Sequence, residues 1–458
     1  MKKGVTVFLT TALCGLIVAS IVSETSAGDL IITPNATHMG KIVIISPLPG
    51  QSTVANGAAL LSVLGGITDA AANNQYVLRL GPGVYDLGGN SLSMQEYVDI
   101  EGSGENTTVI TGTVSNGASP ASVGVVNGAD HAELRFLTVS NTGQTGYTAA
   151  ILNNGKSPRI THVTAAVSGA ASENYGVFNT SSASPMMTDV TVSASGAGTS
   201  IGVLNDNSSP KMRNVSISVT GTGLANLGVE NASSSAPEMT NVSVSTTAPG
   251  GTNNFAIFND GSTPGMNDVI VNVSGGSGLN YGVNNNSSSP TMTNVNISVS
   301  GDAGSDCIGI FNSFSSPSLT RIKARATGGS NSTGISNQSS SPTMTDVIAK
   351  ASGGTTNSAG ISNIDSSPIM TNVTATAENG ALNYGMVDFA TTGSYTIFMD
   401  RSTFSGVTFS VMSDATYTFV IGATKFAGTK PDATATYHCV GSYFVDGSSI
   451  TPLGADCQ

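Results

Sequence analysis

A motif that returns every 25 to 28 residues constrains the fold of this 458-residue chain more than any other feature. Its clearest copy starts at Tyr281 and reads Tyr-Gly-Val-Asn-Asn-Asn-Ser-Ser-Ser-Pro. Eleven copies can be aligned on the small residue at the second position, the anchor, and these anchors are Gly124, Ala150, Gly176, Gly202, Gly228, Ala256, Gly282, Gly309, Gly334, Gly360 and Gly385. A period of this length predicts a solenoid, in which each repeat forms one turn.

The residues inside the period indicate strands, because they are rich in Val, Ile, Thr and Ser and poor in helix formers. After a Pro comes a column of large apolar residues, which are Ile160, Met187, Met212, Met239, Met266, Met292, Leu319, Met344 and Met370. An alternating segment such as Val295-x-Ile297-x-Val299 follows, and the anchor lies in a further short strand. Three short strands per turn, each above its counterpart, predict a single-stranded parallel β-helix.

Three residues after each anchor, the repeat carries an amide or a carboxylate. The column is Asn127, Asn153, Asn179, Asn205, Asn231, Asn259, Asn285, Asn312, Asn337, Asn363 and Asp388. Stacked amides about 4.8 Å apart can donate to one another along the axis, which predicts a buried ladder of side-chain hydrogen bonds.

The repeat, its Asn column and the segment Gly81-Pro82-Gly83-Val84-Tyr85 resemble the right-handed parallel β-helix proteins of the pectin-lyase-like superfamily. The resemblance covers most of residues 50 to 430 and implies that the coil is right-handed. Leu60, Val63, Leu64, Ile67 and Ala71 follow helical spacing, so an N-terminal capping helix is predicted over 55–72. It would cover the bare end of the sheets.

These features divide the chain into five parts. Residues 1–27 have the pattern of a secretory signal peptide, with Lys2 and Lys3 before an apolar run; a retained anchor is the alternative. Residues 28–118 form the N-terminal cap and first coils, and residues 119–390 form the β-helix with its coils of about 26 residues. Residues 391–430 predict two shorter coils, and residues 431–458 a C-terminal cap in which Cys439 and Cys457 could form a disulfide.

The charge composition of the chain limits which classes of partner it can bind. The net charge is −12 and only 10% of residues are charged, without basic clusters, which argues against nucleic acid as a partner. After the first 27 residues no second apolar segment is long enough to span a membrane. The sequence predicts a secreted or cell-envelope protein, and it leaves the oligomeric state open.

Enzymes of the pectin-lyase-like superfamily carry specific catalytic sets. Of the polygalacturonase motifs, only Arg321-Ile322-Lys323 is present, without its partners. A pectate-lyase site needs clustered carboxylates for calcium, yet Asp189 and Asp268 lie three coils apart in their column. We therefore predict no catalytic residue, no metal site and no cofactor.

One column could form a binding surface. Two residues after each anchor stand Val126, Leu152, Phe178, Leu204, Glu230, Phe258, Asn284, Phe311, Ser336 and Ser362. If this column faces outward, its apolar members form a contact stripe, with Phe178, Leu204, Phe258 and Phe311 as candidate binding residues. The alternatives are that loops cover the column or that a local bend turns it inward.

Asp206 and Asp260 are further candidate binding residues, in a neighbouring column. The leading hypothesis is an exported, non-catalytic β-helix that acts as a structural, recognition or adhesive rod at or outside the cell surface. Polysaccharide or another surface protein is its candidate partner. The alternative is a polysaccharide lyase or glycoside hydrolase of the pectin-lyase-like type with an unfamiliar site.

Overall fold

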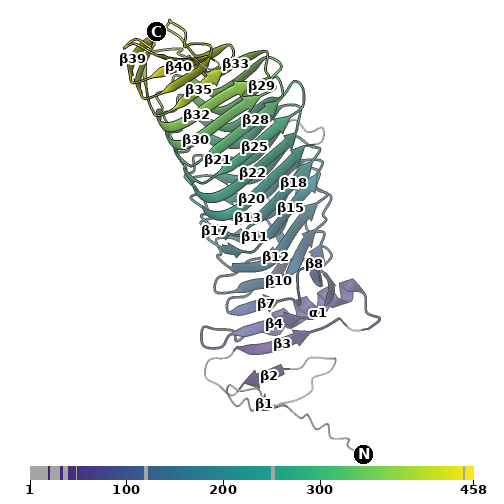
Figure 1. Cartoon of the computed structure of the whole chain (residues 1–458). Helices are drawn as coiled ribbons and strands as arrows, with labels where there is room; N and C mark the ends of the chain where they lie inside the picture. The colour runs from purple at the N-terminus through teal and green to yellow at the C-terminus, as the bar shows by residue number, and fades with distance from the viewer. Residues whose placement is uncertain are drawn as a thin grey trace, which may run out of the picture.

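The protein is a right-handed parallel β-helix, seen here in a computed structural model that describes residues 19–20, 31–34, 40–47, 49–117, 122–248, 253–446 and 449–457. Its coils stack into a rod with the first strands at one end and β39 and β40 at the other (Figure 1). The strands of the described residues form a large sheet of 28 strands and a small sheet of 13 strands. The predicted fold class is confirmed.

From β4 to β36, each coil contributes one strand to the small sheet and one or two strands to the large sheet. The small-sheet strands are β6 (Leu92–Ser93), β9 (Gly124–Asn127), β11 (Tyr147–Asn154), β13 (Glu173–Thr180), β16 (Thr199–Asp206), β19 (Ala225–Ala232), β21 (Asn253–Asp260), β23 (Leu279–Asn286), β26 (Asp306–Ser313), β29 (Asn331–Gln338), β31 (Asn357–Ile364), β33 (Leu382–Phe389) and β36 (Phe409–Ser413). The large-sheet strands are β1 (Ala19–Ser20), β2 (Ile31–Pro34), β3 (Lys41–Ile45), β4 (Tyr76–Leu80), β5 (Gly83–Asp86), β7 (Val98–Glu101), β8 (Thr108–Gly112), β10 (Glu133–Asn141), β12 (Arg159–Ser168), β14 (Met186–Thr188), β15 (Thr191–Gly196), β17 (Lys211–Arg213), β18 (Ser216–Gly221), β20 (Glu238–Ala248), β22 (Gly265–Gly275), β24 (Thr291–Thr293), β25 (Asn296–Gly301), β27 (Ser318–Thr320), β28 (Lys323–Gly328), β30 (Thr343–Ser352), β32 (Ile369–Glu378), β34 (Tyr395–Asp400), β35 (Thr403–Gly406), β37 (Tyr417–Gly422), β38 (Lys425–Gly428), β39 (Thr436–Val440), β40 (Tyr443–Asp446) and β41 (Ser449–Pro452).

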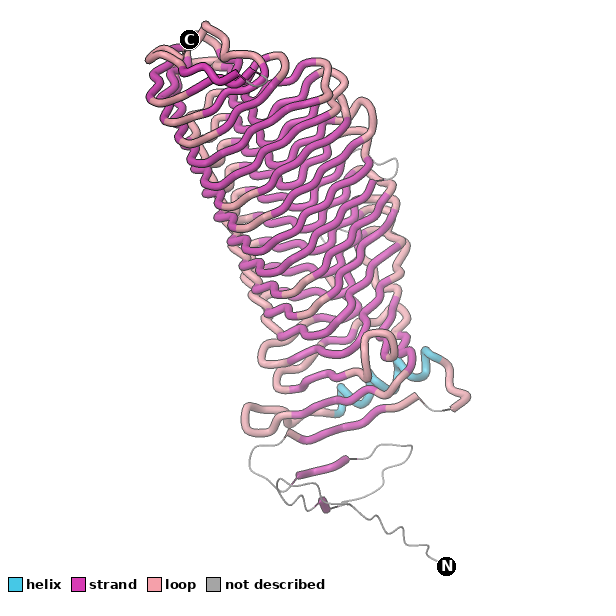
Figure 2. The backbone as a smooth tube through the Cα atoms, viewed as in Figure 1, coloured by secondary structure: helices cyan, strands magenta, loops and turns pink. Residues whose placement is uncertain are grey.

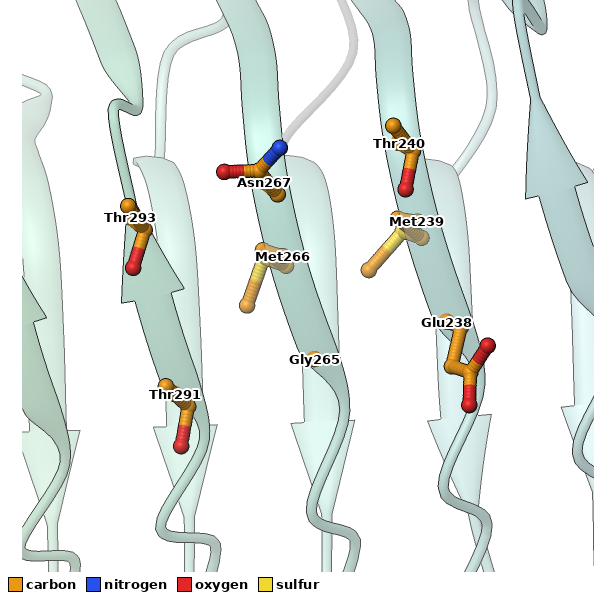
Figure 3. A pocket seen from close by; sticks show the side chains of 8 residues that line it. All are labelled: Glu238, Met239, Thr240, Gly265, Met266, Asn267, Thr291 and Thr293. Atoms are coloured by element: carbon orange, nitrogen blue, oxygen red, sulfur yellow. The ribbon is translucent and has the colours of Figure 1, made fainter.

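The predicted methionine column is a continuous interior stack. Met212 pairs in register with Met239, and Met239 pairs with Met266. All three side chains are almost fully buried. Figure 3 shows Met239 and Met266 pointing the same way from adjacent coils. Because equivalent side chains lie directly above one another, each coil buries its apolar face against the next.

The predicted amide ladder is also present. From Asn153 to Asn363, each buried side-chain Nδ2 donates to the side-chain oxygen of the next coil over 2.6–2.8 Å. The last acceptor is Asp388. The inclusion of Asn127 was wrong. Asn127 pairs with Leu152, so the chain is shifted by one residue in this coil and the glycine that follows Asn127 takes the place opposite Asn153.

A second buried ladder was not predicted. From Ser208 to Ser340, the backbone N–H of each serine donates to the hydroxyl of the serine in the next coil over 2.8–3.1 Å. Its members are Ser208, Ser235, Ser262, Ser288, Ser315, Ser340 and Ser366. These hydroxyls satisfy backbone donors at the corner after the Asn column, where strand pairing stops.

A third ladder runs along the opposite corner, where the backbone is left-handed. Asn214, Asn241 and Asp189 have φ values near 54°, which Asn and Asp tolerate better than other non-glycine residues. Asn241 donates to Asn214 over 2.8 Å, and Asn214 donates to Asp189 over 2.9 Å. This exposed ladder donates toward the N-terminus, whereas the buried amide ladder donates toward the C-terminus.

A helix lies against the first coils, as predicted, but its bounds differ. Helix α1 spans Thr53–Gly66 rather than 55–72, begins at the N-cap Ser52 and ends at the Gly65-Gly66 pair. Ser52 Oγ accepts from the Ala55 N–H over 3.2 Å. Leu60 and Leu64 are buried in the core. Figure 2 shows the helix beside the N-terminal coils.

At the other end the coils shorten. Tyr395 pairs with Tyr417, an offset of 22 residues, and Phe404 pairs with Phe426. Cys439 and Cys457 form a disulfide. Strand β41 then pairs antiparallel with β40, so the last strand does not continue the parallel register.

The proposed signal peptide of residues 1–27 lies outside the described residues, apart from the two residues of β1. Among the helices of the described part of the chain, none is long and apolar enough to cross a membrane.

Replacing Asn285 by Ala should lower the free energy of unfolding by about 2–5 kcal/mol, because Asn259 Nδ2 and Asn312 Oδ1 would both lose their buried partner. Urea unfolding monitored by circular dichroism measures the change. The neighbouring Asn286→Ala removes only an exposed hydrogen bond to Asp260 and should cost less than about 1 kcal/mol. Equal losses in the two variants would contradict a ladder that stabilises the fold.

Burial raises the pKa of Asp388 well above its ordinary value. The folded chain therefore keeps a proton that the unfolded chain releases, so this stabilisation is complete at acid pH and is lost as the pH rises. We expect wild-type stability to fall by up to about 1.4 kcal/mol per pH unit above the ordinary aspartate range. The uncharged Asp388→Asn variant should lack this slope, and urea unfolding from pH 4 to pH 8 tests it. Parallel pH profiles of the two proteins would contradict the assignment.

Candidate functional site

The small sheet bends at every anchor, and the bend decides which side chains face out. Tyr175 pairs with Ile201 and Val177 pairs with Val203, whereas the glycines between them are left out of the pairing. A Cβ on Gly202 would lie 2.5 Å from the Gly228 carbonyl oxygen, so no larger residue fits there without a shift. The residue after the anchor points into the core, whereas the residue before the anchor and the residue two places after it point outward.

An apolar cluster separate from the core therefore lies on the outer side of the small sheet. Its buried members are Ala149, Leu152, Tyr175, Phe178, Ile201, Leu204 and Leu227, with Tyr147, Ala225, Phe255 and Phe258 partly buried against them. The bend brings the columns before and after the anchor toward each other, and Tyr175 stacks on Phe178 at 5.2 Å. The buried members of the column thus stay on the outer side of the sheet and are covered by one another, and they do not join the core.

The predicted binding residues fall into two groups on this face. Phe178 and Leu204 are 1% and 9% exposed, so they are covered by their neighbours. Phe258 and Phe311 are half-buried and lie farther along the rod. Phe255 and Tyr281 connect them, through ring contacts of 5.8, 5.5 and 5.2 Å. These ring contacts occupy the middle of the rod, from β21 to β26.

Glu230 is a site residue that sequence reasoning missed. It lies in the column of Leu204 and Phe258 and pairs in register with both. Its side chain makes no hydrogen bond or ion pair within the described chain. Burial, with the negative charges of Glu173, Asp260 and Asp206, raises the pKa of Glu230 to about 7. The available signal was a carboxylate in an otherwise apolar stretch of the column.

Asp206 and Asp260 lie close to Glu230. Each stands two residues beyond one of Glu230's two strand partners, so the three carboxyl groups come from three successive coils. Asp260 is exposed, Asp206 is half-buried, and Asp260 Oδ1 accepts from Asn286 Nδ2 over 2.8 Å. A carboxylic acid that is partly protonated at neutral pH, as Glu230 is, can donate a proton or a hydrogen bond.

Asn284 adds an acceptor on the same face. It pairs with Phe258 on one side and Phe311 on the other, and its Oδ1 is buried without a hydrogen-bond partner in the described chain. Polar and aromatic side chains thus alternate along the axis in the order Glu230, Phe258, Asn284 and Phe311. We call these four, with Phe255 and Asp260, the small-sheet site.

The large sheet carries a hollow of about 290 Å³ in the same part of the rod. Gly265 has no side chain between Glu238 and Thr291, which leaves a gap above Met239 and Met266 (Figure 3). Glu238 is its one carboxylate, so this hollow has no pair of acid groups. Within the described part of the chain, no three His, Cys, Asp or Glu side chains are grouped to hold a metal ion.

No protein-family model and no curated protein sequence matches this chain. Among solved structures, it is similar to the Azotobacter vinelandii mannuronan C-5 epimerase AlgE4 A-module, with 13% identity and a TM-score of 0.44 over 86% of this chain and 96% of that chain. It is similar to the catalytic domain of a GH87 α-1,3-glucanase in complex with tetrasaccharides, with 12% identity and a TM-score of 0.37 over 88% and 68%. Pectin methylesterase PemA from Erwinia chrysanthemi matches with 11% identity and a TM-score of 0.26 over 48% and 88%. At these values the likeness says nothing about the side chains of this chain.

A ¹³C-carboxyl NMR titration should show Glu230 titrating at about pH 7. Replacing Asp260 by Asn removes one of the charges that oppose its ionisation, so the midpoint should move toward the ordinary glutamate value. Asp346→Asn, at a corner of the large sheet, is the matched control and should leave the midpoint in place. A wild-type titration midpoint in the ordinary glutamate range would contradict the burial of the Glu230 carboxyl group.

Proposed function

We propose that this protein is an exported recognition rod that binds a polysaccharide along the outer face of the small sheet. The observation that carries the proposal is the alternation of half-buried rings and hydrogen-bonding side chains in the small-sheet site. Sugar rings have apolar C–H faces that pack on aromatic rings and hydroxyl edges that donate and accept hydrogen bonds. Both requirements are met at adjacent coils.

The periodicity of the rod favours a linear polymer. Equivalent positions recur about every 4.8 Å along the axis, so a chain of similar sugar units meets a similar set of groups at each coil. Phe258 and Phe311 offer ring faces two coils apart, and Asn284 lies between them with a buried acceptor that has no partner in the described residues. An extended ligand would touch several of these positions at once.

Two features support export. The apolar N-terminal run with its basic start has the pattern of a signal peptide. The disulfide between Cys439 and Cys457 closes the C-terminal end, and such bonds persist in oxidising compartments outside the cytosol. A location at or outside the cell surface would bring the rod into contact with extracellular polysaccharide.

A second candidate function is cleavage of the bound polymer as a glycoside hydrolase or lyase. The observation that favours it is the raised pKa of Glu230 beside Asp206 and Asp260. Glycosidases need one protonated and one ionised carboxyl group. Glu230 would donate a proton to the leaving oxygen, and one of the aspartates would act as the base.

Phe258→Ala and Phe311→Ala should each weaken polysaccharide binding by about tenfold, because each removes a ring face. A glycan array identifies the polymer, and affinity electrophoresis with that polymer measures the change. Phe314→Ala is the matched control, since Phe314 is 67% exposed at a corner off this face. Failure of the wild type to bind any polymer would refute the proposal.

The same polymer tests cleavage, through reducing-sugar release and the absorbance of unsaturated products. Glu230→Gln should retain binding and lose any cleavage that the wild type shows. If the wild type binds the polymer and releases no product, the recognition rod stands and the enzymatic alternative falls.

A further inference from the structure

A second hollow, of about 410 Å³, lies on the other sheet near the N-terminal end of the rod. It opens on the outer side of the large sheet, over the starts of β7, β10 and β12. The side chains that matter for its chemistry are Tyr97, Asp99, His131, Glu133, Ser157 and Arg159. None of them belongs to the small-sheet site.

The hollow exists because a stack of rings stops there. Tyr97 and His131 lie 5.1 Å apart with their planes within 4°. Glu133 pairs with Arg159 in the next coil, which puts Ser157 at the position equivalent to His131. A serine is far smaller than a ring, so among the described residues no third ring packs on the exposed His131 imidazole.

Acceptors line one edge of the hollow. Arg135 Nη1 holds Asp99 Oδ2 at 3.1 Å and Glu133 Oε2 at 2.6 Å, so these two oxygens lie within 5.7 Å of each other, the sum of the two distances. Burial raises the pKa of Glu133, but hydrogen bonds from Thr161 and Arg135 outweigh it and lower the pKa below the ordinary value. Glu133 is therefore ionised, and the carboxyl oxygens of both side chains can accept hydrogen bonds.

Donors lie on the next coil, beside Glu133 and His131. The Arg159 side chain is 67% exposed, and its one ion pair in the described chain is a long one, 3.9 Å from Nε to Glu133 Oε1. Most of its N–H groups therefore face the hollow and solvent. Ser157 Oγ accepts from the Ser184 N–H over 2.9 Å, and its own hydrogen has no acceptor within the described chain.

We propose that this hollow binds a single pyranose ring, which lies flat on His131 and continues the Tyr97–His131 stack. Its hydroxyls donate to Asp99 and Glu133 and accept from Arg159 and Ser157. An aromatic ligand would use the stack but would leave these charged edges without partners, which is why a polyhydroxylated ring fits better. The site is a binding site on a different sheet, so it does not rest on the proposed small-sheet site.

The test is NMR of ¹⁵N-histidine-labelled full-length protein, titrated with the methyl glycosides of glucose, galactose, mannose and glucuronic acid, and with phenol. At least one pyranoside should shift the His131 imidazole resonances saturably and leave His162 unmoved. Ser157→Phe should fill the hollow, and His131→Ala should remove the platform, so that each weakens binding by about tenfold. Ser184→Phe, one coil farther, and His162→Ala, which removes an imidazole stacked on Phe136, are the matched controls and should bind as wild type.

Binding by wild type and both controls, with loss in Ser157→Phe and His131→Ala, would establish the site. The proposal is overturned if none of the four pyranosides gives a saturable shift of His131, or if Ser157→Phe binds as tightly as wild type. Saturable binding of phenol alone would overturn it as well, because it would assign the hollow to an aromatic group.

Discussion

From Asn153 to Asp388, each coil of this protein buries a polar side chain in the same place, and the structure depends on how that group is satisfied. A carboxamide suits the position because it carries a donor and an acceptor on one rigid plane. Each Asn gives its N–H to the next coil and receives one from the coil before, as Asn205 does between Asn179 and Asn231. A slip of one residue would leave such groups buried without partners, at a cost of about 1–3 kcal/mol each. The ladder therefore fixes the register that also aligns the methionines.

The ends of a directional ladder pose a problem that its middle does not. At the C-terminal end the last group must accept and need not donate, and Asp388 meets that need. At the N-terminal end Asn153 keeps an unpaired Oδ1, since a glycine faces it from the coil before. The serine ladder ends differently, on the hydroxyl of Tyr417 two coils away in sequence. Each terminus thus uses a residue type that the repeat itself does not contain at that position.

Much of the fold could be predicted because one period encodes a whole coil. The strands, the methionine stack and the amide ladder all follow from aligning copies of one motif, and they are present. The first copy was misaligned because Gly124 is the small residue that fits the anchor pattern, whereas strand pairing places Val125 opposite the anchor Ala150. The helix end was placed too late because apolar spacing continued to Ala71 beyond the glycine pair that ends α1. The serine ladder was missed because its serines also fit an ordinary turn.

The candidate site was harder to predict than the fold. Phe258, Phe311 and Asp260 were identified as binding residues, and whether they bind a ligand stays a prediction. Glu230 stood in the same column and was passed over, because its burial depends on the bend at the anchors, which strand alternation alone does not reveal. The Tyr97–His131 stack was likewise missed, since the two residues are 34 positions apart and belong to irregular first coils.

Every coil in the amide ladder donates its hydrogen bond in the same direction, and this affects how the number of coils can change during evolution. A whole coil added or removed between Asn179 and Asn337 would present the same donor above and the same acceptor below, so the chain could grow or shrink by duplication without a compensating mutation elsewhere. A partial coil could not be accommodated in this way. The length of the rod can therefore change only by whole coils. Its two ends, which differ chemically from the repeat, have to be kept.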